Sequence, residues 1–464
     1  MKNKILKVAL LSIGLLTLNV SCSDDFVDRE FYQEVEQAPL KSVQEVESFV
    51  RGGYAAMRSQ YYYGCDFLAY GEVRSDEMLS NGASGYYVNV MNYTQTSADA
   101  YAKDTWNHIY KTVGLANVVI NTDFSSFNQD DKDYAGFLQG QAYAIRALGF
   151  FDLLRLYGQK YTGSSTNLGI VLPLKYDPLA KQPRSTIAET EAQIAADFAK
   201  AEQLMEDHAG WDLGSSNRTE LSLSAVKGLM ARFYLYKGDY AKVRQLVNDI
   251  VDSNEYEVVG AANLQSSFTF AMNGSASNSI FELAVGNASA LGTASYRHKL
   301  SNGGYRNLVV RPATVALYSV ADVRRSLITT GATNYLSNSN GVKGKYLNAS
   351  GADNIKMLRY EEVLLDGVEA ELNGGSATKA LEYFNEIQLS RNLPAAASVD
   401  MVELKKERTR ELLGEGLRQW DLRRWGDAVP RPANASTSPL LNAFPIPLSE
   451  TNVGAVQSNP GYDN

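Results

Sequence analysis

Residues 224–251 read SAVKGLMARFYLYKGDYAKVRQLVNDIV, a stretch with two helical patterns and one break. The first pattern covers 224–236, the second covers 239–251, and Lys237-Gly238 separates them. Glycine is favoured directly after the end of a helix, so the break predicts a tight turn between two helices. Helix hairpins of this kind are the unit of tetratricopeptide-like stacks. We therefore expect a mostly α-helical chain built from such pairs.

Helical spacing recurs on both sides of this hairpin. Ser42 and Glu45 form a capping-box pattern, which predicts a helix of roughly four turns from Ser42. The sequence predicts one further helix that starts near Thr105, one that runs from near Asp133 to Gly158, and one that ends near Met205. Three more helices are predicted over 354–372, 376–391 and 401–425. Because no strict period of about 34 residues is present, the sequence predicts a loose stack and not a regular array.

Two stretches, 59–98 and 260–350, do not follow the helical pattern. The first is rich in Tyr, Gly, Ser and Asn, and the second in Gly, Ser and Asn, with one strand-like run at 279–285. Long irregular segments inside a domain tend to be functional loops or disordered linkers, and the many aromatic residues argue against disorder. We therefore expect both stretches to be ordered insertions in a single domain spanning 41–464.

The N-terminus has the features of a secretory signal peptide. Lys2, Lys4 and Lys7 precede a Leu-rich apolar run at 8–18, and small or polar residues follow. This run is shorter than the roughly 18 residues that a membrane-spanning helix needs. We therefore expect residues 1–21 to be cleaved from the mature protein.

Cys22 directly follows this segment and is the expected lipidation site. The sequence LNVSC at 18–22 resembles a lipoprotein processing box, although its leucine lies four places before the cysteine, where three is usual. An ordinary secretory signal with a chance cysteine is the alternative. The sequence SDD at 23–25 resembles an acidic signal that sends lipoproteins of some Gram-negative bacteria to the outer face of the cell. Residues 22–40 would then form a flexible, lipidated tether.

Composition excludes several functional classes. Without the signal peptide, 41 basic and 52 acidic residues remain, a balance that argues against a nucleic-acid partner. Cys22 and Cys65 are the two cysteines, and since a lipidated Cys22 cannot form a disulfide, Cys65 is predicted to be a buried small apolar residue. The three histidines lie at least 90 residues apart, without the spacing of a zinc site. Phosphate-loop, nucleotide-binding and nucleophile-elbow motifs are also absent from the sequence, so we predict no catalytic residue, metal or cofactor.

The run 407–424 alternates basic and acidic residues, with opposite charges within helical reach of each other. Leu412, Leu417, Trp420 and Trp425 lie among or next to these charges. Such a run could be read as an active site or as an anion-binding patch. We interpret it as an ion-paired helix that buries one side against the stack.

Five segments along the chain together carry a pattern typical of one protein family. They are 106–117, which begins WNHIY; 141–158, which begins QAYAIRA; 358–370, which begins LRY; 407–425; and 445–462, which begins PIP. In this order they resemble the SusD/RagB family of outer-membrane nutrient-binding lipoproteins. Glu361 departs from the family pattern, in which a small apolar residue is usual, and Gly414 loosens the last helix. The resemblance covers the whole chain.

The resemblance implies a fold, a partner and a location. Family members stack tetratricopeptide-like helix pairs and carry an irregular ligand-binding face with few short strands. They lie as lids over a SusC-like, TonB-dependent β-barrel transporter in the outer membrane and pass it glycans or, in some branches, peptides. By resemblance, this chain is a non-enzymatic lipoprotein on the exterior of the outer membrane that binds an oligosaccharide, with an oligopeptide as the alternative ligand.

Tyrosine indicates where the ligand site lies. Residues 61–110 hold nine of the chain's 28 tyrosines, where an even spread would put three. Tyrosine offers a flat apolar face to a sugar ring or a peptide side chain, and a hydroxyl to the polar edge of either. In the family, loops of the two irregular regions meet on one exposed face, which implies a composite site here. The predicted site residues are Tyr61, Tyr62, Tyr86, Tyr87, Tyr296, Arg74, Asp76, Asn81 and Arg297.

Three alternatives are open at this level. Each tyrosine could instead pack its loop onto the stack, and Tyr101 and Tyr110, which lie in a predicted helix, are expected in the core. A surface glycoside hydrolase would need a pair of carboxylates opposed across a cleft beside the aromatic loop. A structural adaptor that binds only protein would need no exposed tyrosine cluster.

Overall fold

The structure, a computed structural model, describes residues 39–161, 165–177, 180–433 and 435–462. The predicted signal peptide, Cys22 and nearly all of the predicted tether lie outside these residues. Leu40–Asn464 forms one unit by its internal contacts. Within the described ranges, none of the helices has both the length and the apolar character needed to cross a membrane.

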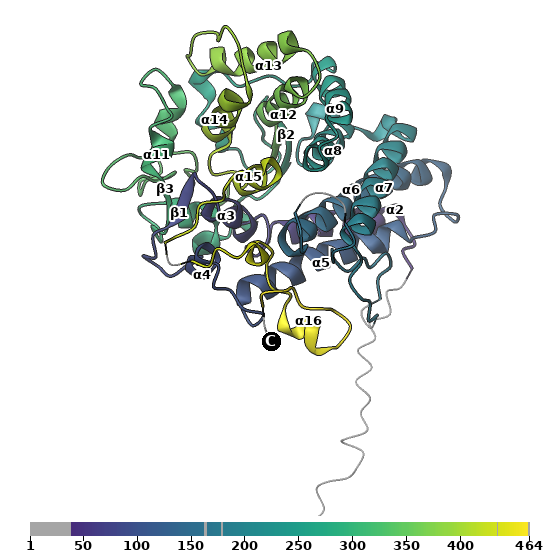
Figure 1. Cartoon of the computed structure of the whole chain (residues 1–464). Coiled ribbons are helices and arrows are strands. Elements are labelled where there is room, and N and C mark those ends of the chain that lie inside the picture. The colour runs from purple at the N-terminus through teal and green to yellow at the C-terminus, as the bar shows by residue number, and fades with distance from the viewer. Residues whose placement is uncertain (1–38, 162–164, 178–179, 434, 463–464) are drawn as a thin grey trace, which may run out of the picture. The chain divides into compact units, whose positions relative to one another are not determined.

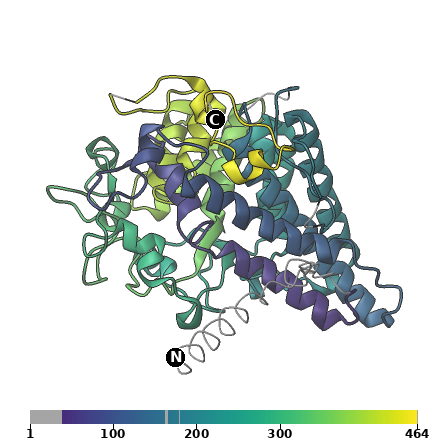
Figure 2. The ribbon, with the colours of Figure 1, turned by 90° about the horizontal axis from the view of Figure 1, so that it is seen from below.

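Long helices, packed side by side, make up most of the fold. They are α2 (Val43–Met57), α5 (Ala100–Ile120), α6 (Gln129–Tyr157), α7 (Ile187–Asp207), α8 (Leu223–Lys237), α9 (Tyr240–Asp252), α12 (Tyr360–Leu372), α13 (Ala377–Ser390) and α14 (Met401–Leu412). α6 packs on α5 and α7, α8 on α9, and α12 on α9, α13 and α14 (Figure 1). Figure 2 shows α2, in purple, beside the blue helices on which it packs, α5 and α6. The predicted fold class, a mostly helical stack of tetratricopeptide-like pairs, is confirmed.

Short helices and strands occupy the regions between the long helices. The helices are α3 (Asp66–Val73), α4 (Val88–Asn92), α10 (Tyr296–Leu300), α11 (Pro312–Val315), α15 (Arg418–Trp425) and α16 (Leu448–Asn452). The strands are β1 (Met78–Ser80), β2 (Ser279–Leu283), β3 (Leu308–Val310) and β4 (Ile355–Arg359). They form two antiparallel pairs, β1 with β3 and β2 with β4. β2 confirms the strand-like run predicted at 279–285.

The hairpin of α8 and α9 forms as its sequence predicts. Ser222 accepts a hydrogen bond from the backbone N–H of Ala225, and Asp239 accepts one from Lys242, so both helices have N-terminal caps. Gly238 follows α8 with φ 71°, the left-handed conformation that ends a helix at no steric cost for glycine. α9 therefore packs back along α8.

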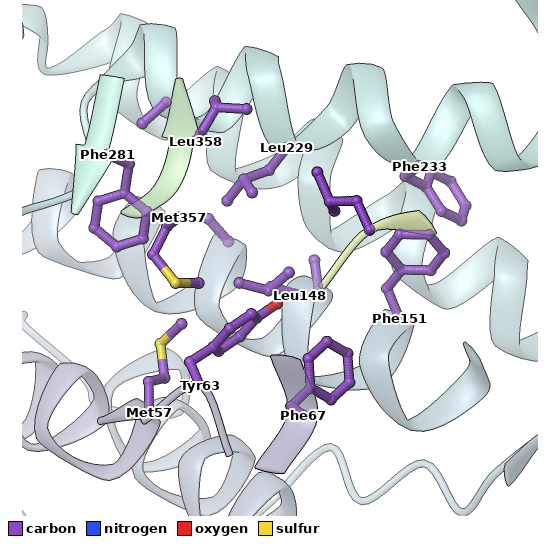
Figure 3. Packing of buried hydrophobic residues seen from close by; sticks show 14 of the residues in the cluster. Met57, Tyr63, Phe67, Leu148, Phe151, Leu229, Phe233, Phe281, Met357 and Leu358 are labelled. Carbon is purple, nitrogen blue, oxygen red and sulfur yellow. The ribbon is translucent and has the colours of Figure 1, made fainter. Parts of the chain in front are cut away.

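One apolar core joins the stack to the segments between its helices. Phe151 of α6 meets Phe233 of α8 edge to face, with ring centroids 5.4 Å apart (Figure 3). Phe67 of α3 and Met357 of β4 are also buried in this cluster, close to Leu148 of α6 in Figure 3. Full burial of such a side chain stabilises a protein by roughly 1.5–3 kcal/mol. The core therefore fixes α3 and β4 against the helices.

The prediction of a single helix over 401–425 is wrong, since α14 and α15 are separate helices. Gly414 and Gly416 lie between them with φ of 79° and 76°, values that do not occur in a continuing right-handed helix. A Cβ built on Gly71 of α3 would lie 2.0 Å from the backbone oxygen of Gly416. The two backbones can approach this closely where the chain turns because Gly71 has no side chain.

Two further helical assignments differ from the sequence prediction. The sequence predicts an irregular conformation for residues 66–73, yet they form α3, and all residues of this helix are buried. A helix buried on every side has no polar face, so its sequence shows no helical stripe. Residues 355–359 form the strand β4, so the helix predicted over 354–372 begins only at Tyr360.

The charged run 407–424 is ion-paired, as predicted, but many partners lie outside its own helices. Glu411 of α14 lies 2.9 Å from Arg391 and 3.0 Å from both Arg324 and Arg359, and all four side chains are buried. Burial alone would raise the pKa of Glu411, but Arg391 and the other two arginines hold it well below its usual value. These pairs tie α14 to three distant parts of the chain.

Candidate functional site

Backbone pairing brings the two irregular regions together. β1 of the first region pairs with β3 of the second, with Met78 opposite Val310. Just beyond β1, the backbone N–H of Asn81 donates to the Asn307 carbonyl at 2.9 Å, and its side-chain amide donates to the Arg306 carbonyl at 2.8 Å. Figure 1 shows β1, α3 and α4 beside β3 and α11. The meeting of these regions, which the family resemblance implies, is therefore present.

A pocket with a volume of about 460 Å³ opens where both regions meet the start of α5. Ligand sites for small molecules commonly have volumes of roughly 300–1,000 Å³. Tyrosines, carboxylates, amides and a lysine make up most of the lining. The lining residues are Gln60, Tyr61, Asp66, Tyr86, Asn89, Asp99, Ala100, Tyr101, Asp104, Thr293, Ala294, Lys299 and Tyr305.

Tyr86 and Tyr305 form one aromatic wall of this pocket. Their ring centroids lie 4.8 Å apart with a tilt of 51°, and both residues are half-buried. The ammonium nitrogen of Lys299 lies 3.3 Å from the Tyr86 centroid and 4.2 Å from that of Tyr305. Cations are attracted to aromatic faces, so Lys299 holds both rings in place. Burial lowers the pKa of Lys299.

Tyr61 provides a second aromatic surface and is held against α5. Its ring contacts the His108 ring, with centroids 4.8 Å apart and a tilt of 42°. The hydroxyl of Thr105 donates a hydrogen bond to the Tyr61 carbonyl at 2.8 Å. Tyr61 is half-buried, so part of its ring remains available to a ligand.

The N-terminal part of α5, with its cap, supplies a third tyrosine, Tyr101, and two carboxylates. Asp99 caps the helix by accepting from the backbone N–H of Tyr101 at 2.9 Å, and it also accepts from the side-chain amide of Asn89. Asp104 lies one turn further along, and its nearest cation is Lys103, at 3.9 Å. Burial raises the pKa of Asp99, although the hydrogen bonds that it accepts oppose this shift.

Asp66 lies deeper in the pocket wall. It is 7% exposed and accepts a hydrogen bond from the Tyr87 hydroxyl at 2.6 Å. Burial raises the pKa of Asp66 to about 7, against the opposing effects of the Tyr87 hydrogen bond and the Lys299 charge. Cys65 is buried next to it, as predicted, with its sulfur 3.2 Å from the Tyr87 hydroxyl.

Of the nine predicted site residues, Tyr61 and Tyr86 line this pocket. Tyr62 and Tyr87, their immediate neighbours in sequence, are fully buried. The Tyr62 hydroxyl donates to Asp152, and the Tyr87 ring stacks on Tyr101 with centroids 5.1 Å apart. Burial raises the pKa of both hydroxyls. The Tyr87 ring therefore supports the pocket lining from inside, and the Tyr62 ring belongs to the core.

The predicted polar anchors have structural contacts elsewhere. Arg74 is fully buried and donates to the Val90 carbonyl and the Gln95 side chain. Asp76 forms an ion pair with Arg418 of α15, at 2.7 Å. Asn81 is exposed and joins the two irregular regions through the backbone contacts described above.

Tyr296 and Arg297 line a different and much smaller cavity, of about 60 Å³. Tyr296 is 4% and Arg297 is 7% exposed, so both belong to the interior. The guanidinium of Arg297 donates to the Asn338 carbonyl at 2.9 Å. The structure therefore separates these two residues from the tyrosine-lined pocket.

Sequence reasoning missed several residues of the pocket. The sequence predicts Tyr101 in the core because it lies in a helix, but it belongs to the first turn of α5 and lines the pocket. Tyr305 stood out within Gly- and Asn-rich sequence and could have been included on that ground. Lys299, Asp99 and Asp104 carry no sequence signal, because the fold alone brings them beside the rings.

A larger hollow, of about 650 Å³, lies between α5 and the C-terminal segment. Trp106 and Tyr110 contribute to its lining. Trp106 is only 3% exposed, because its ring packs against Tyr110 and Tyr157 at centroid distances of 4.7 and 4.9 Å. Trp106 therefore presents little aromatic surface, whereas the tyrosines that line the pocket between the two irregular regions are all half-buried, and we take that pocket as the candidate site.

Two family models match the chain. The one described as "Starch-binding associating with outer membrane" matches residues 25–235, and the one described as "SusD family" matches residues 329–440. The chain belongs to the SusD/RagB family. In this SusD/RagB protein α2, α5, α6 and α7 lie within the first matched range, and α12, α13 and α14 lie within the second.

Relatives of this SusD/RagB protein match over nearly their whole length. SusD-like protein P2 of Formosa agariphila is 23% identical, over 97% of this chain and 98% of the relative. A solved SusD superfamily structure from Bacteroides thetaiotaomicron has a TM-score of 0.79 at 24% identity, over 90% of this chain and 100% of that chain. Surface glycan-binding protein A from Bacteroides fluxus has a TM-score of 0.72 at 19% identity, over 92% and 100%. These structures share the fold.

Proposed function

We propose that this SusD/RagB protein is a cell-surface lipoprotein that captures an oligomeric glycan and passes it to a SusC-like, TonB-dependent β-barrel transporter. The observation that carries the proposal is the pocket in which half-buried tyrosine rings lie beside carboxylate acceptors. Its proposed ligand contacts are Tyr61, Tyr86, Tyr101, Tyr305 and Asp104. The other predicted residues are reassigned to supporting the site or the fold.

The chemistry of this lining suits a sugar. Tyr61 and Tyr86 can each cover the C–H face of a sugar ring, with an aromatic contribution of about 0.5–1.5 kcal/mol beyond the area buried. Asp104 can accept hydrogen bonds from sugar hydroxyls. A few such contacts give weak binding, since a dissociation constant near the millimolar scale corresponds to about 4 kcal/mol. Weak capture suits a protein that must release its cargo to a transporter.

A glycan is favoured over a peptide by the family comparisons. One matching family model is described as starch-binding, and one structural neighbour as a surface glycan-binding protein. An oligopeptide is the second candidate ligand, because tyrosine faces and carboxylates also suit apolar and basic side chains. A binding screen that contains both classes separates the two.

Binding without turnover fits the placement of the carboxylates. Hydrolysis of a glycosidic bond needs two carboxyl groups that both face the bond. Asp99 is engaged in capping α5 and in accepting from Asn89, and Asp66 is 7% exposed and bonded to Tyr87. Asp104 is then the lining carboxylate best placed to reach a ligand, and a single carboxylate does not suffice.

The test is a binding screen of the mature protein against neutral hexasaccharides and hexapeptides, with product formation followed in parallel. We expect a neutral glycan to bind, and the Tyr61→Ala/Tyr86→Ala variant to bind it about 5- to 140-fold more weakly, from two lost aromatic contacts. Tyr234→Ala is the matched control, because Tyr234 is also half-buried but lies on α8, outside the pocket lining.

Two results would overturn the proposal. Equal loss of glycan binding in the pocket variant and in Tyr234→Ala would show that the pocket is not the site. Release of shorter saccharides by the wild-type protein, lost in an Asp104→Asn variant, would show that it is a hydrolase.

The membrane anchor is proposed on sequence grounds. Cys22 should carry the lipid, and residues 22–40 should let the domain reach its transporter while it stays attached. Labelling of expressing cells with a radioactive fatty acid should mark the wild-type chain and not Cys22→Ala. Digestion of intact cells with an external protease should remove the domain if it faces the exterior, and a protected domain would contradict that orientation.

A further inference from the structure

The charged side chains that line the pocket differ in how accessible they are to a ligand. Asp104 has a side chain that is 27% exposed, and Asp99 is half-buried beside it on α5. Lys299 also lines the pocket but is only 4% exposed. A ligand that enters the pocket therefore meets carboxylates before it meets the ammonium group.

The ammonium group of Lys299 makes its contacts inside the protein. Its ammonium lies 3.3 Å and 4.2 Å from the centroids of Tyr86 and Tyr305, and it interacts with the charge of the deeper Asp66. Moving this ammonium toward a ligand would break both aromatic contacts. Lys299 thus holds the wall in place, and its charge is opposed by that of Asp66, so Asp99 and Asp104 leave the pocket lining with an excess of carboxylates.

An exposed lysine of α5 also lies close to Asp104. Lys103 approaches Asp104 at 3.9 Å, but its side chain is 52% exposed and does not line the pocket. Pairs at such exposed positions are weak, because water and salt screen them. Lys103 therefore reduces the negative potential around Asp104 without cancelling it.

We infer that the pocket accepts uncharged or amino-bearing glycans and rejects glycans that carry carboxylate or sulfate groups. This inference rests on the proposed function. An anionic group about 5 Å from Asp104, at an effective dielectric constant of about 40–80, weakens binding by roughly tenfold, and an ammonium gains a similar factor. The excess of acidic over basic residues in the mature chain, 52 against 41, adds repulsion of polyanions at low ionic strength. Sugar hydroxyls remain free to donate to the Asp104 carboxylate.

Two matched pairs of hexamers test the inference by calorimetric titration, alongside the neutral hexasaccharides of the screen. The first pair is hexagalacturonate as the free acid and as its full methyl ester, which share a backbone and differ in charge. The second pair is the glucosamine hexamer and its N-acetylated, uncharged form. We expect the acid to bind at least about tenfold more weakly than its ester, with a smaller difference at high salt. The glucosamine hexamer should bind at least as tightly as its acetylated form.

A charge reversal assigns the effect to the pocket. Asp104→Lys should tighten binding of the hexagalacturonate acid by about tenfold or more and weaken binding of the glucosamine hexamer. Asp252→Lys makes the same change on an exposed residue at the C-terminal end of α9 and should leave both affinities within about twofold.

The possible failures are distinguishable. If the hexagalacturonate acid binds as tightly as its ester, and Tyr61→Ala/Tyr86→Ala abolishes that binding, the charge selection is wrong and the glycan site stands. If none of the glycans binds the wild-type protein, the proposed function itself is wrong. An equal response to Asp104→Lys and Asp252→Lys would also overturn the charge selection, because the effect would then come from net charge alone.

Discussion

Replacement of Glu411 by alanine removes the acidic centre of the buried charge cluster. Its two carboxylate oxygens lie 2.9–3.0 Å from the guanidinium groups of Arg391, Arg324 and Arg359. The variant Glu411→Ala leaves these buried arginines without a shared partner, and breaking a buried ion pair in this way costs about 3–5 kcal/mol. We therefore expect the free energy of unfolding to fall by about that amount.

Urea unfolding, followed by circular dichroism at neutral pH, measures this loss. Glu403→Ala is the control, because Glu403 pairs with Lys406 at 2.6 Å but both side chains are more than 40% exposed, so the loss should stay below about 1 kcal/mol. The folded-state pKa of Glu411 is depressed below its usual 4.5, so its contribution is present above that pH and is lost as the pH falls toward the folded-state pKa. A loss below about 1 kcal/mol for Glu411→Ala at neutral pH would refute the reasoning.

Three further predictions follow from particular contacts. Gly416→Ala should cost about 2 kcal/mol or more, because φ is 76° and a Cβ would lie 2.7 Å from the Leu68 Cα. Gly426→Ala is the control, because Gly426 has φ 72° but a Cβ added there would meet open space, so the variant should cost only the backbone strain of about 1–2 kcal/mol. An equal loss of stability in the two variants would contradict the effect of the close approach at Gly416. Asp66 has a raised folded-state pKa of about 7, so its contribution to stability is present below about pH 4 and is lost as the pH rises to about 7. Asp66→Asn should remove this dependence of the free energy of unfolding on pH, as measured by urea titrations at several pH values. If the wild type and the variant show the same dependence on pH, the assignment to Asp66 is wrong. Tyr62→Phe should lower the free energy of unfolding by about 1–2 kcal/mol, because the hydrogen bond to Asp152 is lost. The glycan affinity of this variant should stay within about twofold of wild type, and a larger change would show that the Tyr62 ring contacts the ligand.

Local sequence patterns predict the helical stack, but they cannot predict features that depend on contacts between residues far apart in the sequence. The turn at Gly238 could be read from the sequence, since glycine after an amphipathic run has a local cause. The break at Gly416 could not, because it depends on the backbone of Gly71, far away in sequence. The helix α3 gave no periodic signal because all its faces are buried.

The site could be predicted as a region but not as a set of side chains. Tyrosine density pointed to 61–110, and the pocket does lie there in part. Of two adjacent tyrosines, Tyr86 lines the pocket and Tyr87 is buried, because Tyr87 has φ 60° and its ring turns into the core. Such a backbone conformation is uncommon for tyrosine and has no sequence signature.

A crystal structure of the protein with the tightest-binding hexasaccharide of the screen tests the central claim most directly. Sugar rings should lie against Tyr61 and against the wall of Tyr86 and Tyr305, with a hydroxyl donating to Asp104. A saccharide bound instead in the hollow beside Trp106 would contradict the assignment of the site.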